Sequence, residues 1–526
     1  MALPSPDSLF SKTPFYASLT LISLLQSFAD SQIVQTPNRN ALITQLSTNP
    51  DDITARVSLY RDLLDTGEAS LEGLRVAAGL GDPAANGVVA QLDTSVLANR
   101  PGPLLPQLRG LPVDHLELNN AEPEWCDALV GLPLRTLVLN SPRFICGPEM
   151  WQRLQATALE TLEVSNFSRD DNARCLPPTA RLRRLKLQTY GEDFDDRFLR
   201  QLSDSPLQEL SLNRCDDITD DGLEALSRLK LRSLTLQRVG ELTSRGMAHL
   251  ASHPLEHLAL SDCGAILDDP AWLGDLTRLR SLSLDGCYAG ESVLQAIRGL
   301  PLEKLSLHSA FICEDDLEVL EGMPLADLDL KCLRQVIERL DVLHGFPLKR
   351  LGLSDVQGVC ADTLSDLREL ALESLDLSLN DISWKELKQL AGLPLKRLDL
   401  SYCRGIDGKV LRKLVELGLP LEALEISGLD LRDADLACLR DLPLQRLGLL
   451  DSPWLTDTGV VHLGRMPLRD LTIGADPGES RITSAVVPVF EQLPLQKLWL
   501  PNCSGIDANG WDRLARLPAR VIGPGI

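Results

Sequence analysis

The chain repeats a short pattern of apolar positions, LxxLxL, at nearly constant spacing. If the first apolar residue of each copy is taken as its anchor, the pattern occurs 17 times between Val113 and Leu495. Eleven of the 16 spacings between anchors are 23 or 24 residues, and a fixed period of this length is the sequence signature of a stacked repeat array. The pattern predicts an array over residues 107–526, with about 17 repeats of about 24 residues.

One repeat, PLQELSLNRCDDITDDGLEALSRL, shows which elements each unit forms. Leu207, Leu210 and Leu212 alternate with polar residues, which places them on one face of a short strand. The apolar residues of DDGLEALSRL then recur at helical spacing, and Thr219 precedes them at a position where its side chain can cap the helix. Strand, turn and helix therefore repeat along the chain, which predicts an α/β solenoid.

A small side chain recurs eight residues after the anchor, where the chain turns inward from the strand. Five repeats have cysteine there and one has asparagine: Cys215, Cys263, Cys287, Cys403, Cys503 and Asn380. Buried free thiols behave as small hydrophobic groups, so we expect these cysteines to be structural. Free thiols also indicate a reducing compartment, and we predict that the protein is cytoplasmic.

These repeats resemble the leucine-rich repeat family over roughly residues 107–526. Cysteine at the turn, followed by ITDDGL at the start of the helix, resembles the cysteine-containing subclass found in F-box proteins and in bacterial relatives. The resemblance implies a horseshoe-shaped solenoid with a parallel sheet on its concave face and helices on its convex face.

Two N-terminal segments without the repeat precede the array. Residues 1–38 include the apolar run FYASLTLISLLQSF, which is too short and too polar to span a bilayer; we expect a helical or poorly ordered segment, with an export signal as the alternative. Residues 39–100 are predicted to form a small helical domain that caps the array. Within residues 39–95, NPDDITARVSLYRDLLDTGE resembles the helical repeat-companion modules found beside leucine-rich repeats in bacterial proteins.

Charge narrows the classes of partner. The formal net charge is −22 and the pI is near 4.8, which argues against binding to nucleic acid or to an anionic membrane surface, since both require a basic patch. Of these classes of partner, a protein is the one that the charge does not disfavour. We expect the chain itself to be a monomer.

No motif in the sequence predicts catalysis or a cofactor. The stretch CDDITDDGLEAL places Asp217, Thr219 and Asp221 like the first ligands of a calcium loop, but the twelfth position, which needs glutamate, is Arg228. His249 and His257 fall on a helix and on the next strand, so a zinc site is not favoured. We therefore predict a protein that is not an enzyme and that holds no metal ion.

The strand register suggests which residues could bind a partner. Side chains two, four and six residues after each anchor form three columns that should face the concave side. The second column is mostly basic late in the array, the fourth is acidic and the sixth is small and polar. The candidate partner-binding residues are His308, Asp329, Arg350, Asp376, Arg397, Asp399, Glu425, Arg446 and Trp499.

Two interpretations of these columns stay open from sequence alone. Opposite charges, such as those of Arg397 and Asp399, can pair with each other, which would leave a neutral, solvated sheet. Otherwise the columns form a charged surface that binds a protein. Our main hypothesis is a non-enzymatic scaffold that binds a protein partner on the concave face. The alternative is an F-box-like substrate-recognition subunit of a ubiquitin ligase, or a secreted bacterial effector that mimics one.

Overall fold

A computed structural model describes most of the repeat region in two compact units, residues 1–232 and 233–526. The described residues are 114–119, 129, 132, 134–146, 154, 157–169, 181–189, 195–214, 216–238, 241–517 and 519–523. The predicted N-terminal segment, the predicted cap, the companion-module resemblance and any F-box-like region lie outside them.

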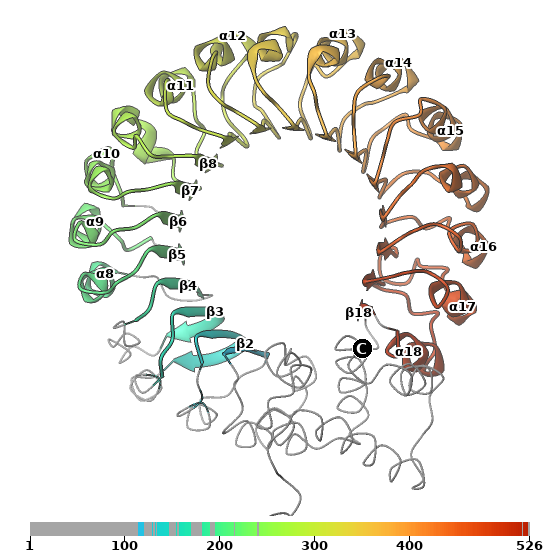
Figure 1. The fold of residues 1–526 in the computed structure, drawn as a ribbon, viewed down its shortest axis with the longest axis horizontal. Helices are drawn as coiled ribbons and strands as arrows, with labels where there is room; N and C mark the ends of the chain where they lie inside the picture. Colours follow the sequence, from blue (N-terminus) through green and yellow to red (C-terminus); the bar gives the residue numbers. More distant parts are fainter. Residues whose placement is uncertain are drawn as a thin grey trace, which may run out of the picture. The chain divides into compact units, whose positions relative to one another are not determined.

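Parallel strands form the inner layer of each unit (Figure 1). Unit 1 contains β1 His115–Asn119, β2 Thr136–Cys146, β3 Thr161–Arg169, β4 Arg184–Thr189 and β5 Glu209–Asn213. Unit 2 contains β6 Ser233–Gln237, β7 His257–Ser261, β8 Ser281–Asp285, β9 Lys304–Ser306, β10 Asp327–Asp329, β11 Arg350–Gly352, β12 Ser374–Asp376, β13 Arg397–Asp399, β14 Ala423–Glu425, β15 Arg446–Leu449, β16 Asp470–Ile473, β17 Lys497–Trp499 and β18 Arg520–Ile522.

Short helices form the outer layer. In unit 1 these are α8 Asp196–Leu202 and α9 Asp220–Leu226. The α-helices of unit 2 are α10 Ser244–Met247, α11 Glu291–Ile297, α12 Glu314–Leu317, α13 Ala361–Asp366, α14 Trp384–Leu387, α15 Gly408–Glu416, α16 Asp457–Val461, α17 Val487–Phe490 and α18 Ala508–Leu514. Its 3₁₀ helices are η4 Ala248–Ser252, η5 Gly264–Leu267, η6 Pro270–Asp275, η7 Glu318–Leu320, η8 Asp341–Gly345, η9 Leu367–Glu369, η10 Lys388–Leu390, η11 Asp433–Asp441 and η12 Ser484–Val486.

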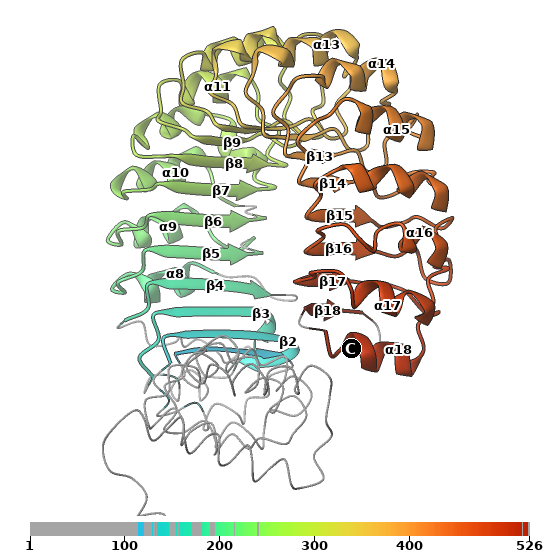
Figure 2. The same ribbon diagram turned by 45° about the vertical axis from the view of Figure 1, so that its right-hand side comes forward.

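The strands of unit 2 stack in register, so equivalent residues of successive repeats lie side by side (Figure 2). Leu351 of β11 pairs with Leu375 of β12, which pairs with Leu398 of β13. These leucines are almost fully buried, and the side chains on either side of them face the concave surface. The predicted strand, turn and helix are confirmed in the described repeats from β4 to β17, some of which have a 3₁₀ helix in place of the α-helix, and with them the second and fourth columns.

The turn after each strand is held by the residue eight positions after the anchor. The Cys403 thiol donates a hydrogen bond to the carbonyl oxygen of Leu377 in the preceding repeat, at 3.0 Å. Asn380 does the same through its amide, which lies 2.7 Å from the carbonyl oxygen of Leu353. The predicted burial of Cys263, Cys287, Cys403 and Cys503 is confirmed, and the hydrogen bonds explain why a small donor recurs there. Cys215 lies outside the described residues.

The last strand, β18, was not predicted from the repeat pattern. It pairs in parallel with β17 through Val521 and Leu498. Its repeat carries Pro518 and Gly523 where other repeats carry leucine, so the LxxLxL search ends one strand early. None of the described helices has the length and apolar character needed to cross a membrane.

Candidate functional site

A hollow of about 280 Å³ lies on the concave face of unit 2, over strands β10 to β15. Seven of the nine predicted binding residues line it: Asp329, Arg350, Asp376, Arg397, Asp399, Glu425 and Arg446. The other two do not. His308 follows β9, and Trp499 lies on β17, so both are on the same face beyond the hollow. We call this region the charged hollow.

The strand register sets its acidic row. Asp376 pairs with Asp399, and Asp399 pairs with Glu425, so three carboxylates occupy equivalent positions on neighbouring strands. Neighbouring strands are about 4.8 Å apart, a spacing at which like charges raise each other's energy. The row therefore gains stability from any cation that reaches it.

Second-column arginines at either end of the hollow do not neutralise this row. Arg350 Nε lies 2.9 Å from Asp327 Oδ2, and an Arg446 Nη lies 2.8 Å from Asp470 Oδ2. In both pairs the aspartate is in the same column on an adjacent strand, β10 for Asp327 and β16 for Asp470. Both arginines are therefore paired within the second column. They form no ion pair with the carboxylates of the fourth column.

Arg397 has no such neighbour. Its second-column neighbours are Ser374 and Ala423, neither of which is acidic. Within the described part of the chain it forms no ion pair with Asp399, although its sequence position suggested one. Asp399 and Glu425 likewise have no ion-pair partner among the described residues. The picture of a self-neutralised sheet is therefore wrong for this half of the hollow.

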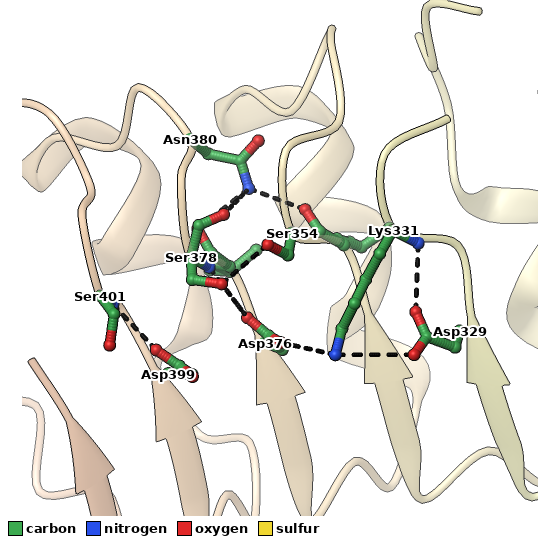
Figure 3. A network of polar contacts seen from close by, with 10 residues as sticks. Asp329, Lys331, Ser354, Asp376, Ser378, Asn380, Asp399 and Ser401 are labelled. Atoms are coloured by element: carbon green, nitrogen blue, oxygen red, sulfur yellow. Dashed lines mark hydrogen bonds and ion pairs between the residues drawn. The ribbon is translucent and has the colours of Figure 1, made fainter. Parts of the chain in front are cut away.

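Lys331 neutralises the other half, and the sequence reasoning missed it. Its ammonium nitrogen lies 3.5 Å from Asp329 Oδ2 and 3.0 Å from Asp376 Oδ2 (Figure 3). Burial lowers the pKa of Lys331, but the contacts with Asp376 and Asp329 outweigh it and raise the pKa above its ordinary value. The signal was available, because Lys331 stands at a sixth position that is serine in the next four repeats.

Glycine makes room for this bridge. A Cβ on Gly352 of β11 would lie 2.7 Å from Asp329 Oδ1 and 3.1 Å from Lys331 Cε. Gly448 of β15 plays a similar part for Glu425, whose carboxylate occupies the place where a Cβ would stand. Both glycines are in the fourth column, so the acidic row is interrupted where its side chains need space.

The sixth column supports the carboxylates and is not an open surface. Its serines are buried: Ser354, Ser378, Ser401 and Ser427. The backbone N–H of Ser378 donates to Asp376 Oδ1 at 3.0 Å, and its hydroxyl lies 2.7 Å from the same oxygen (Figure 3). The backbone N–H of Ser401 donates to Asp399 Oδ1 at 2.9 Å. Ser378 and Ser401 therefore orient the acidic row, and the four serines are too buried to form an open surface of their own.

Burial shapes the protonation of the row. Burial raises the pKa of Asp329 and of Asp399 above the ordinary range, although hydrogen bonds from Ser401 partly offset this for Asp399. Burial and the nearby Asp399 charge raise the pKa of Glu425 to about 7, against the opposing effect of Arg446. Glu425 therefore exchanges its proton near neutral pH, as expected for a carboxyl without a counter-ion.

The arrangement suits a cationic organic group better than a metal ion. Across the described ranges, no group of three or more His, Cys, Asp or Glu side chains is placed to hold a metal ion. The carboxylates lie in a row along the sheet and do not converge on one point. An ammonium or guanidinium can bridge two members of such a row, as Lys331 does.

One family profile matches part of the repeat region. A family profile described as "Leucine Rich repeat" matches residues 203–227, which supports a leucine-rich repeat family, and the fold is an α/β leucine-rich repeat solenoid. No curated protein matches the chain. A chain in the crystal structure of the Rad7 and Elc1 complex in yeast is similar at 14% sequence identity, over 94% of this chain and 99% of that chain, with a TM-score of 0.38.

Proposed function

We propose that the chain is a non-enzymatic scaffold that binds a protein partner on the concave face of unit 2. One observation carries this proposal: Arg397, Asp399 and Glu425 line a hollow without an ion-pair partner in the described part of the chain. Asp399 and Glu425 are half-buried, whereas Arg397 is exposed. Half-buried, unpaired charges such as those of the two carboxylates lower the stability of a fold unless something compensates them. A partner that supplies the opposite charge would do so.

The surroundings of the hollow favour a large ligand. Stable protein interfaces bury roughly 800 Å² on each partner, far more than the hollow alone offers. Trp499 of β17 is 38% exposed and pairs with Ile522 of β18, which is 37% exposed. His308 is half-buried just after β9, beyond the other end of the hollow. The proposed surface therefore runs from His308 to Trp499, with the charged hollow between them.

The proposal is tested by affinity capture from native lysate. The variant Asp399→Arg/Glu425→Arg reverses the charge of the unpaired carboxylates, and Glu318→Arg/Glu416→Arg is its control, because those two glutamates are exposed on helical segments of the outer layer. We expect the first variant to lose at least tenfold in captured partner, about 1.4 kcal/mol, and the control to capture normally. Circular dichroism verifies that both are folded. Equal capture by the two folded variants would place the binding site elsewhere.

A further inference from the structure

Exposed apolar side chains concentrate at one edge of unit 2. We call the loops that follow the strands, seven to eleven residues after each anchor, the exit rim. Of nine exposed large hydrophobic side chains in the described ranges, six lie there: Tyr288, Phe311, Val336, Leu379, Tyr402 and Trp454. The exit rim borders the charged hollow, because each loop leaves the strand directly after the acidic and serine columns.

Leu379 is the most informative member of this set. Its side chain is 54% exposed, and its backbone has a φ of 62°, a left-handed conformation that bulky residues rarely adopt. Several repeats place polar residues at this turn in the same conformation, for example Asp355 and Asn502, whereas the next repeat has the bulky Tyr402 with a φ of 57°. Folding alone gives no reason for leucine here, and an unfavourable residue kept at a surface points to a contact.

Tyr402 occupies the equivalent turn of the next repeat, and its ring extends from there toward the repeats that follow. The backbone N–H of Leu379 donates to the carbonyl oxygen of Ser401 at 2.8 Å, so the two turns lie side by side. The Tyr402 ring lies over Gly428, where a Cβ would be only 2.2 Å from its Cδ1. Its hydroxyl donates to Asp451, and this hydrogen bond raises the pKa of Tyr402 to about 12. The ring is therefore neutral and held in place.

The apolar and acidic groups come from consecutive repeats, with Leu379 after β12, Asp399 and Tyr402 on and after β13, and Glu425 on β14. Leu379 follows Asp376 by three residues, and Tyr402 follows Asp399 by three residues. Three extended residues span at most roughly 10 Å. A cation above the acidic row and an apolar group on the rim can thus come from one short segment of a partner.

We propose that the partner binds the hollow through a segment that carries a lysine or arginine next to an apolar side chain. The basic group lies between Asp399 and Glu425, and the apolar group lies on the exit rim against Leu379. This inference rests on the proposed function and names the chemistry of the partner.

Three observations favour this occupant. Lys331 already shows how an ammonium bridges two carboxylates of the row, at 3.0 and 3.5 Å. A net charge of −22 favours association with a basic partner and disfavours a second copy of this chain. An anionic ligand would meet Arg397 as the one unpaired cation of the hollow, among the described residues, but also the whole acidic row.

The test is selection from a random peptide library displayed on phage, with the intact chain as bait. We expect enrichment of peptides in which lysine or arginine is close to an aliphatic or aromatic residue. A selected peptide, synthesised with a fluorophore, should lose at least tenfold in affinity for the variant Asp399→Asn/Glu425→Gln and for Leu379→Ser in fluorescence anisotropy. Matched controls are Glu318→Gln/Glu416→Gln, on the helical layer, and Phe311→Ser, which is 48% exposed on the same rim away from the hollow. These should bind normally.

Several results would overturn the inference. Enrichment of acidic peptides, no enrichment, or equal binding of the selected peptides by Asp399→Asn/Glu425→Gln would each contradict a basic and apolar partner segment. If capture from lysate still depends on the charged hollow, the proposed function stands and only the partner chemistry is wrong. If capture does not depend on the hollow, both proposals fail.

Discussion

The ammonium nitrogen of Lys331 lies 3.0 Å from Asp376 Oδ2, although Lys331 follows β10 and Asp376 belongs to β12, two strands away. The side chain crosses β11 at Gly352, where no side chain blocks it. This single contact divides the charged hollow into a neutralised half and an acidic half. The acidic half, with Asp399 and Glu425, is where we place the partner.

Removing the ammonium should destabilise unit 2. Lys331→Met leaves Asp329 and Asp376, which flank Gly352 of β11, without their shared counter-ion. We expect a loss of about 1 kcal/mol in the free energy of unfolding, reduced by the partial exposure of the pair. Urea denaturation measures it. Arg339→Met is the control, because the Arg339 ion pairs are exposed and should contribute little. An equal effect of the two substitutions would argue against a special role for Lys331.

A methyl group on the intervening strand should disturb the same bridge. In Gly352→Ala the added Cβ would lie 2.7 Å from Asp329 Oδ1, so the carboxylate and the lysine must both move. We expect a loss on the order of 1 kcal/mol in the free energy of unfolding, measured in urea. In the matched variant Gly345→Ala the nearest atom would be Glu321 Cγ at 3.9 Å, so that variant should be as stable as the wild type or more so.

Much of this site follows from the sequence, because parallel strands in register convert a repeat period into columns of neighbours. The positions of Asp376, Asp399 and Glu425 in one row were predicted in this way. The partners of each charge were not, because a long side chain such as that of Lys331 can pass over a glycine to reach a second strand. An arginine of the second column forms an ion pair within that column only where an adjacent strand has an acidic residue at the same position. The spacing of the strands alone does not predict these pairs.

Protonation of Glu425 should make stability depend on pH. Its pKa is about 7 in the folded protein against an ordinary value of 4.5, so its contribution to stability is present below pH 4.5 and is lost as the pH rises through 7. Burial is the main cause of the raised pKa, the charge of Asp399 on β13 adds to it, and Arg446 on β15 opposes it.

The variant Glu425→Gln tests this dependence. Because Gln cannot ionise, the variant should match the wild type near pH 4.5 and exceed its stability above pH 7 by on the order of 1–2 kcal/mol, after allowance for solvent screening. Thermal denaturation at several pH values gives the comparison. A constant difference between the two proteins from pH 4.5 to 8 would show that Glu425 does not titrate in this range.

The thiols should differ in reactivity. Hydrogen bonding from Thr363 lowers the pKa of Cys360, whereas burial raises the pKa of Cys403 to about 12 and also raises that of Cys503. Because the thiolate is the reactive form, iodoacetamide should modify Cys360 first among the eight described cysteines. Mass spectrometry of the native protein follows each site. Modification of Cys403 as fast as that of Cys360 would contradict a buried, structural role for the turn cysteines.

The exit rim shows the limit of periodic reasoning. The leucine pattern predicts only buried positions, so it does not predict that Leu379, at the turn, is exposed. Its left-handed conformation and its position beside Tyr402 emerge only when consecutive turns are stacked. Burial of the sixth-column serines was missed for the same reason, because alternation along a strand ends where the chain turns inward.

Carboxyl footprinting of the captured complex tests the central claim most directly. Asp and Glu side chains are coupled to glycine ethyl ester in the free protein and in the complex with its captured partner, and each site is quantified by mass spectrometry. Binding in the charged hollow predicts that labelling of Asp399 and Glu425 falls at least severalfold in the complex, while labelling of Glu318 and Glu416 is unchanged. Unchanged labelling of Asp399 and Glu425 in the complex would contradict it.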